Sequence, residues 1–177
     1  MHNLSNAIAA FILAFKAGLA AEKLMEAWRD FPGVERRLQV LIHTDNRILI
    51  DDYAHHPTEI NAVFETLDQA FPEKKKCAVF QPHLFTRTRD FMGEFARVLS
   101  QFDRVVLLDI YPARELPIEG IDSGVLLKRI QAVPATLLSK KELPSFLSEA
   151  KEEIVAIMGA GDIGVEVEKI KKALADE

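Results

Sequence analysis

Short apolar segments that alternate with helical patterns constrain the fold of this chain more than any other feature. Six segments after Gly33 are short, apolar and typical of strands: Leu38–His43, Ile48–Asp52, Cys77–Gln81, Arg104–Asp109, Ala135–Ser139 and Ile154–Met158. Helical patterns lie between and after them, at Pro57–Ala70, Thr86–Ser100, Ser123–Gln131, Lys141–Ala150 and Ile163–Ala175. This alternation predicts an α/β fold with a mostly parallel six-stranded sheet, helices on both faces and right-handed connections. Only the first two strands, which flank a hairpin turn at Thr44–Arg47, are expected to pair directly along the chain.

The stretch before Gly33 has a different character. It predicts two helices, Asn3–Ala17 and Ala20–Phe31, that are separated at Gly18, and it carries no strand pattern. Two helices alone bury little apolar surface, so we expect this pair to belong to a larger domain. We therefore place a boundary at Pro32-Gly33 and predict two parts, residues 1–33 and 34–177.

Charge and hydropathy exclude several classes of protein. The net charge of −5 argues against a protein that grips nucleic acid by its phosphates. The apolar run Ala7–Phe15 lacks a basic start and ends at Lys16, far short of a membrane span, so we read it as a helix buried on most sides. The single cysteine, Cys77, cannot form an internal disulfide. We expect a cytoplasmic protein with neither a membrane nor a nucleic-acid partner.

Polar residues gather where the predicted strands end. They occur as Asp51–His56 after the second strand, Gln81–His83 after the third, Asp109–Glu115 after the fourth and Gly159–Asp162 after the last. Ligands of open α/β sheets bind beyond the carboxyl ends of the strands. Four polar loops at that edge therefore predict a binding site.

The loop Asp51–Glu59 admits three readings. It could be a helix cap with incidental histidines, because Pro57 suits the first helical position and Glu59 the first turn. A metal site is a second reading, but neighbouring histidines in one short loop rarely converge on one ion, so we predict no metal. In the third, Asp52 binds a ribose and Tyr53 stacks beside it.

Basic residues suggest anion sites at two places. Arg87, Arg89, Thr86 and the first amides of a helix could receive an anion, although solvated arginines would look the same. Arg36-Arg37 could reach a phosphate or simply lie at the surface.

Gly159–Gly164 matches the spacing G-x-G-x-x-G after a strand and before a helix. The dinucleotide fingerprint also needs a further strand with an acidic end, which the 177 residues do not supply. We therefore expect a tight strand-to-helix turn in which Asp162 caps the helix. The sequence G-x-x-x-x-G-K-S/T does not occur in these residues, so the cradle for any nucleotide phosphates would lie elsewhere.

Four blocks, in order, resemble those of UDP-N-acetylmuramate–L-alanine ligases. They are Asp51–Ile60, Phe80–Asp90 without its middle residues Leu84 and Phe85, Asp109–Glu115 followed by Pro117–Gly120, and Gly159–Ile163. His2, Asn3 and Asn6 resemble the end of the family's central ATPase domain. Leu84 and Ala54 depart from the pattern, since some members have arginine and many have glycine at these positions.

The resemblance implies a part of an ATP-dependent ligase of peptidoglycan precursor synthesis in cell-wall biogenesis. Such ligases phosphorylate the lactyl carboxylate of UDP-N-acetylmuramate, and L-alanine then attacks the acyl phosphate. They have an amino-terminal UDP-sugar domain, a central P-loop ATPase domain and a Rossmann-like carboxyl-terminal lobe. By this resemblance, residues 1–33 are a helical remnant of the central domain and 34–177 the lobe. Magnesium ligands are expected in the central domain.

The resemblance also implies roles for individual residues. Six would bind the nucleotide: His2, Asn3, Asn6, Arg37, Asp52 and Tyr53. His83, Thr86 and Arg87 would face the carboxylate end of the muramoyl substrate or the incoming amino acid. His55 and Arg87 would lie at the reacting centre.

Three other functions compete with this one. A murein-peptide recycling ligase would share the Asp52–Pro57 loop but, we expect, not the Gln81–Arg89 block. A non-catalytic nucleotide-binding module would use Gly159–Gly164, and a metal-dependent hydrolase would use Asp52, His55 and His56. If the ligase reading holds, these 177 residues alone are folded and inactive, because the phosphate-binding loop is missing.

Overall fold

A computed structural model of the chain describes residues 2–175, with side chains described for residues 5–175. It divides into two compact units, residues 1–35 and 36–177.

The first unit is a pair of helices, α1 (His2–Lys16) and α2 (Ala21–Arg29). Gly18, with φ of +96°, lies between them, where a left-handed conformation suits glycine. The rings of Phe11 and Trp28 pack with their centroids 5.5 Å apart. The expectation that α1 is buried on most sides is wrong, since Leu13 is 69% and Phe15 54% exposed. One short partner helix covers only part of the apolar surface of α1.

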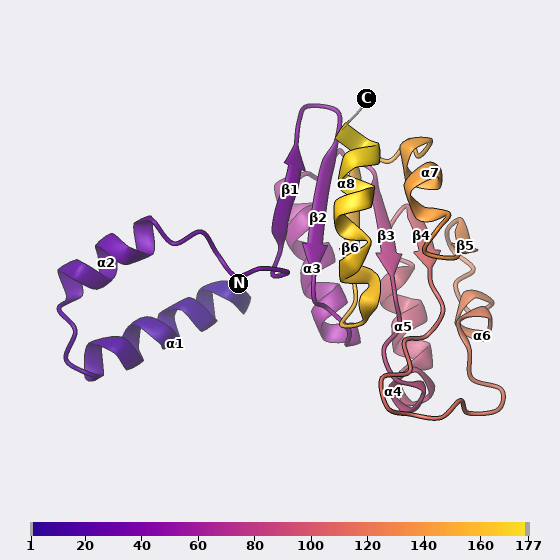
Figure 1. The fold of residues 1–177 in the computed structure, drawn as a ribbon, viewed down its shortest axis with the longest axis horizontal. Coiled ribbons are helices and arrows are strands. Elements are labelled where there is room, and N and C mark those ends of the chain that lie inside the picture. The colour runs from indigo at the N-terminus through magenta and orange to yellow at the C-terminus, as the bar shows by residue number, and fades with distance from the viewer. Residues whose placement is uncertain (1, 176–177) are drawn as a thin grey trace. The chain divides into compact units, whose positions relative to one another are not determined.

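The second unit is built on one six-stranded sheet (Figure 1). Its strands are β1 (Gln39–His43), β2 (Ile48–Asp52), β3 (Lys76–Phe80), β4 (Arg104–Leu107), β5 (Ala135–Leu137) and β6 (Ile154–Met158). They lie in the order β1-β2-β6-β3-β4-β5. Only the β1–β2 pair is antiparallel, and it closes through the turn in which the Thr44 amide donates to the Arg47 carbonyl at 2.9 Å. The predicted mostly parallel sheet and its hairpin are confirmed.

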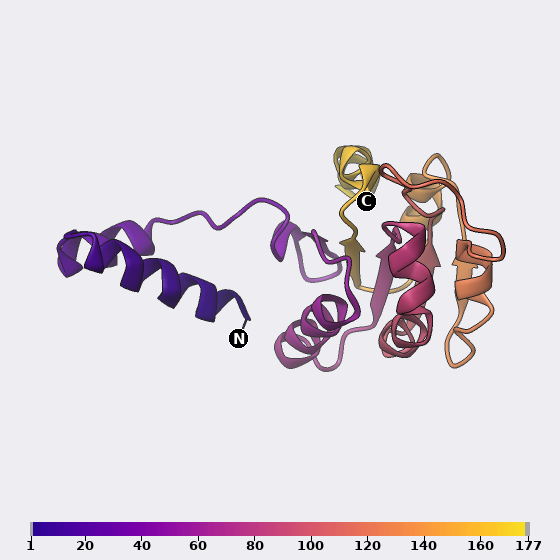
Figure 2. The same cartoon turned by 90° about the horizontal axis from the view of Figure 1, so that it is seen from below.

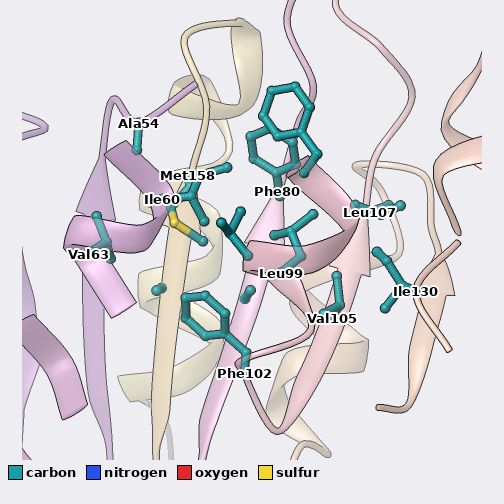
Figure 3. Packing of buried hydrophobic residues seen from close by; sticks show 14 of the residues in the cluster. Ala54, Ile60, Val63, Phe80, Leu99, Phe102, Val105, Leu107, Ile130 and Met158 are labelled. Carbon is teal, nitrogen blue, oxygen red and sulfur yellow. The ribbon is translucent and has the colours of Figure 1, made fainter. Parts of the chain in front are cut away.

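Helices cover both faces of this sheet (Figure 2). The elements are α3 (Pro57–Ala70), α4 (Phe85–Asp90), α5 (Met92–Leu99), α6 (Ser123–Leu127), α7 (Leu143–Ser148), the 3-10 turn η1 (Asp162–Val165) and α8 (Val167–Ala175). Residues from α3, α5 and α6 pack with alternate strand residues such as Phe80 and Leu107 (Figure 3). The intervening strand residues, Val79 and Val106 among them, pack with α7 and α8. The predicted three-layer α/β architecture is thus confirmed.

Two predicted helices differ in the structure. Thr86–Ser100 is not one helix, because α4 ends at Asp90 and α5 starts at Met92, with Phe91 between them as the cap of both. The last predicted helix begins as the 3-10 turn η1 before α8. Among residues 2–175, no helix combines the length and apolarity needed to cross a membrane.

Candidate functional site

The loops that follow β2, β3 and β4 meet at one edge of the sheet. The five parallel strands all end there, and four rings from three loops form a row. Ring centroids lie 5.4 Å apart for Tyr53 and His55, 6.0 Å for His55 and His83, and 5.6 Å for His83 and Tyr111. The loop after β2, with Tyr53 and His55, and the loop after β3, with His83, therefore form one continuous surface with Tyr111, which we call the wall.

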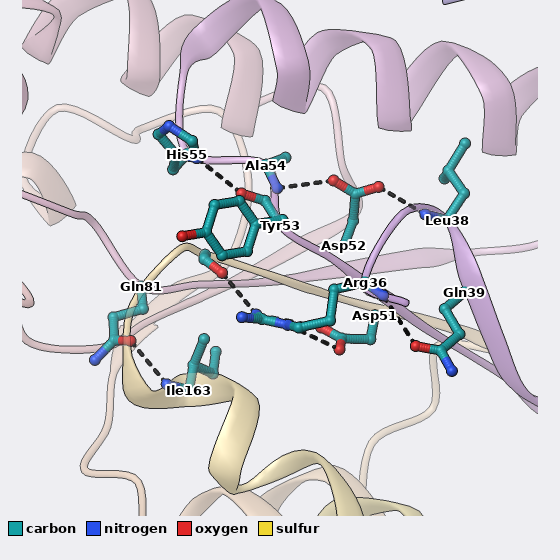
Figure 4. A network of polar contacts seen from close by, with 11 residues as sticks. Arg36, Leu38, Gln39, Asp51, Asp52, Tyr53, Ala54, His55, Gln81 and Ile163 are labelled. Carbon is teal, nitrogen blue, oxygen red and sulfur yellow. Dashed lines mark hydrogen bonds and ion pairs between the residues drawn. The ribbon is translucent and has the colours of Figure 1, made fainter. Parts of the chain in front are cut away.

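Asp52 organises the first of these loops (Figure 4). One oxygen of its carboxylate accepts from the Leu38 amide and the other from the Ala54 amide, both at 2.7 Å. Burial raises the pKa of Asp52, and the two amide bonds oppose that rise. Asp52 is only 6% exposed. A ribose hydroxyl at Asp52 would have to use the remaining lone pairs of a carboxylate already engaged by the fold.

Tyr53 and His55 have side chains that are partly exposed beside the buried Asp52 of this loop. Tyr53 is 37% exposed, and the guanidinium carbons of Arg36 and Arg37 lie 5.2 and 5.7 Å from its ring centroid. His55 Nδ1 lies 2.8 Å from the Tyr53 carbonyl oxygen. A carbonyl can only accept, so Nδ1 carries the proton, and Nε2 is the acceptor whenever the ring is neutral. His56 instead turns to Thr58 and, with Glu59, caps α3.

The second loop carries His83, Thr86 and Arg87. A nitrogen of the Arg87 guanidinium lies 3.5 Å from His83 Nδ1, and guanidinium groups only donate. Burial lowers the pKa of His83, and the neighbouring charges of Arg87 and, less strongly, His55 lower it further. The lowered pKa favours the neutral form of His83 at pH 7. Arg89 is half exposed and pairs with Asp90, so it lies apart from this group.

Thr86, one member of the predicted anion receptor at the start of α4, is already engaged by the fold. The Thr86 amide donates to Glu115 Oε2 at 3.0 Å, and the Thr86 hydroxyl donates to Glu115 Oε1. A hydroxyl has one proton to donate, so Thr86 cannot hold Glu115 and donate to a substrate carboxylate at once. Arg87 remains the cation of this loop that faces the wall.

Arg36 proves to be a structural residue rather than an exposed basic one. Its side chain donates to Asp51 at 3.1 Å and to the Gly159 carbonyl at 2.6 Å (Figure 4). Burial raises the pKa of Asp51, and the hydrogen bond and charge of Arg36 oppose the rise. Arg36 thus ties the start of the second unit to the ends of β2 and β6. Arg37, by contrast, is exposed.

The glycine-rich loop is shaped by packing within the fold. A Cβ on Gly159 would lie 3.0 Å from the Gln81 carbonyl oxygen, and one on Gly161 would lie 2.5 Å from Gln81 Oε1. The expected helix cap by Asp162 is wrong. Gly161 occupies that position, whereas Asp162 accepts from Gln81 Nε2 at 2.8 Å and pairs with Lys140. Sequence reasoning missed Gln81 and Lys140 as anchors, since both contacts join segments distant in the chain.

A cleft of about 300 Å³ opens beside the wall, between the loops that follow β3, β4, β5 and β6. Gln81, Tyr111, Lys140 and Asp162 line it. The cleft shares Tyr111 with the row of rings. The candidate site thus continues from Tyr53 to the Lys140–Asp162 ion pair.

The remaining predicted site residues belong to the first unit. The side chains of His2 and Asn3 lie outside the described residues, and Asn6 is exposed on α1. Among the residues whose side chains are described, no three histidine, cysteine or acidic side chains form a group that could hold a metal ion.

Comparison with known proteins decides the family. Residues 36–174 match the family described as Mur ligase, glutamate ligase domain. The chain belongs to this family. A UDP-N-acetylmuramate–L-alanine ligase of Christiangramia forsetii is 54% identical over 176 residues, which make up 99% of this chain and 39% of that relative. The chain therefore spans about two fifths of the length of such curated relatives.

Two solved structures extend the likeness. The UDP-N-acetylmuramate-alanine ligase of Thermotoga maritima superposes with a TM-score of 0.80 at 27% identity, over 99% of this chain and 38% of that one. A domain of a UDP-N-acetylmuramate:L-alanyl-gamma-D-glutamyl-diaminopimelate ligase from Haemophilus ducreyi has a TM-score of 0.59 at 28% identity. That match covers 78% of this chain and 99% of the domain. The match to the Thermotoga maritima structure therefore includes residues of both units of this chain.

Proposed function

We propose that this Mur ligase chain is the carboxyl-terminal lobe of an ATP-dependent ligase that joins L-alanine to UDP-N-acetylmuramate. The contact between His55 and His83 supports this most strongly, because it brings the two loops with the family's motifs into one wall. Five relatives at 41–54% identity are named UDP-N-acetylmuramate–L-alanine ligases. Residues 1–33 would then complete a central ATPase domain, and the intact protein would act in the cytoplasm.

The residues present fit part of a nucleotide. Tyr53 offers a half-open ring, and Arg37 beside it is an exposed cation that suits a phosphate. Asp52 would reach a ribose only through its spare lone pairs. His2, Asn3 and Asn6 would meet the base, and a separate domain would hold the phosphates and Mg²⁺. ATP would supply the phosphoryl group that activates the sugar's carboxylate.

The wall supplies what this reaction demands of the lobe. Transfer to a carboxylate gathers negative charge, which is best stabilised by fixed cations and donors. Arg87 provides a permanent positive charge, and neutral His83 can donate from Nε2. His55 offers an acceptor at Nε2 that could receive a proton from the attacking amine. We assign substrate binding to His83 and Arg87. Thr86 contributes only indirectly, because its backbone helps to place Arg87 and its own donors are bound to Glu115.

A murein-peptide recycling ligase remains the second candidate, favoured by the Haemophilus ducreyi likeness. It would attach a peptide in place of the single amino acid. Both candidates use UDP-N-acetylmuramate and ATP, so the acceptor amine distinguishes them.

A chimera tests the proposal. The aligned 176 residues of the Christiangramia forsetii relative are replaced by this chain, and ADP release is followed with UDP-N-acetylmuramate and each amine. We expect release with L-alanine that requires both substrates, and none with the tripeptide L-alanyl-γ-D-glutamyl-diaminopimelate. The unaltered relative serves as control. A chimera that melts like the control yet responds only to the tripeptide, or to neither amine, would contradict the proposal.

A further inference from the structure

The start of α4 has an unusual backbone. Leu84, which precedes the helix, has φ of +73° and ψ of 133°, a conformation that L-residues with a branched side chain rarely adopt. Such a conformation persists only where neighbouring contacts impose it. The orientation of α4, and of Arg87 in its first turn, depends on those contacts.

Two sets of contacts come from the connection after β4. The Leu84 amide donates to the Tyr111 carbonyl at 2.9 Å, and the Tyr111 amide donates to the Pro82 carbonyl at 2.8 Å. Four residues further on, Glu115 accepts from the amide and hydroxyl of Thr86. Residues 82–86 are thus held at both ends by residues 111–115.

The Glu115 carboxylate is held in its charged form. The hydrogen bonds from the Thr86 side chain and amide lower the pKa of Glu115, and the Phe85 amide contributes. The carboxylate is therefore ionised at pH 7 and binds both donors of Thr86 with charge-assisted hydrogen bonds.

We propose that Glu115 is a positioning residue of the ligase site, an inference that rests on the proposed function. By holding Thr86 it fixes Arg87 next to His83, and it keeps substrate carboxylates away from the donors of Thr86. The substrate carboxylate is thereby directed to Arg87. A simple helix cap would stabilise α4 without this effect on substrate placement.

The contact is tested by NMR on the 177-residue chain. Because the Thr86 amide binds Glu115, its chemical shift should titrate below pH 4.5, the ordinary pKa of a glutamate. Glu115→Gln should abolish this titration and loosen the Arg87 Nε–H, seen as a lower heteronuclear NOE. Glu94→Gln, which removes an exposed acid from the next helix, should change neither. A Thr86 amide that does not titrate, or an Arg87 NOE unchanged in Glu115→Gln, would overturn the proposal.

The effect on catalysis is tested in the chimera. Glu115→Ala should lower kcat roughly tenfold or more without raising KM for either carboxylate-bearing substrate, because a freed Thr86 still binds them, but in the wrong place. Acetate should fill the vacancy and restore kcat. Unchanged kcat, or loss of activity that acetate does not restore in protein with an unchanged melting temperature, would refute the positioning role. An inactive unsubstituted chimera would instead overturn the proposed function, while the NMR titration would still decide the contact.

Discussion

At the scale of single residues, the proposed function places its strongest electrostatic requirement on Arg87. Arg87→Ala should lower kcat/KM for ADP release by the chimera about a hundredfold, the usual cost of losing one aimed donor to developing charge. Arg89→Ala is the matched control, since Arg89 lies two residues on in α4 but pairs with Asp90. We expect it to retain most of the activity. Equal losses in the two variants would mean that net charge, not placement, matters.

The lowered pKa of His83 predicts how the stability of the fold depends on pH. Burial and the nearby Arg87 lower the pKa of His83 below 6.5, so the unfolded chain binds a proton there before the folded chain does. His83 therefore makes its full contribution to the free energy of unfolding above pH 6.5. This contribution declines as the pH falls toward the pKa of His83 in the folded chain. An NMR titration should give a His83 midpoint below 6.5 that rises in Arg87→Ala. A midpoint at or above 6.5 in the unaltered chain would contradict this account.

Other residues show why sequence alone could not complete the site. The sequence predicted Asp52 and Thr86 as ligand-binding residues from their types and positions. The structure engages both with the fold, Asp52 through the Leu38 and Ala54 amides and Thr86 through Glu115. These partners lie up to 29 residues away in the chain, and only the folded backbone brings them together.

At the scale of elements, the inner strands could be predicted well because β2, β3 and β6 are runs buried on both faces. β2 and β6 have the predicted bounds, as does α3, whose start is marked by Pro57 and Glu59. The predicted helix 86–100 was wrong at Phe91, where no glycine or proline signals the break between α4 and α5.

Two glycines in different elements should respond in opposite ways. A Cβ at Gly161 would lie 2.7 Å from Tyr111 Cβ, so Gly161→Ala should destabilise the second unit by about 1–3 kcal/mol, as overpacking does. Gly93 lies in α5 with open space around it, and Gly93→Ala should add roughly 0.5–1 kcal/mol through helix propensity. Urea unfolding of both variants measures these changes. Stabilisation by Gly161→Ala would show that the loop packs less tightly than described.

At the scale of the whole molecule, the sheet carries the candidate site and the two units differ in how fully their apolar surfaces are covered. Both faces of the sheet are covered, whereas the two-helix unit leaves residues such as Leu13 and Met25 largely exposed. The sequence predicted the sheet and its polar edge correctly because strand direction alone brings those loops together. It could not predict which polar groups stay available to a ligand.

The central claim is that the carboxyl edge of the sheet faces the reacting substrates. Hydrogen–deuterium exchange in the chimera, with and without ATP, Mg²⁺ and UDP-N-acetylmuramate, tests it most directly. We predict that substrates slow exchange in residues 52–56, 81–87, 109–115 and 159–163, which lie at this edge. Protection confined to the opposite edge, at residues 44–47, 72–75 and 101–104, would contradict the account.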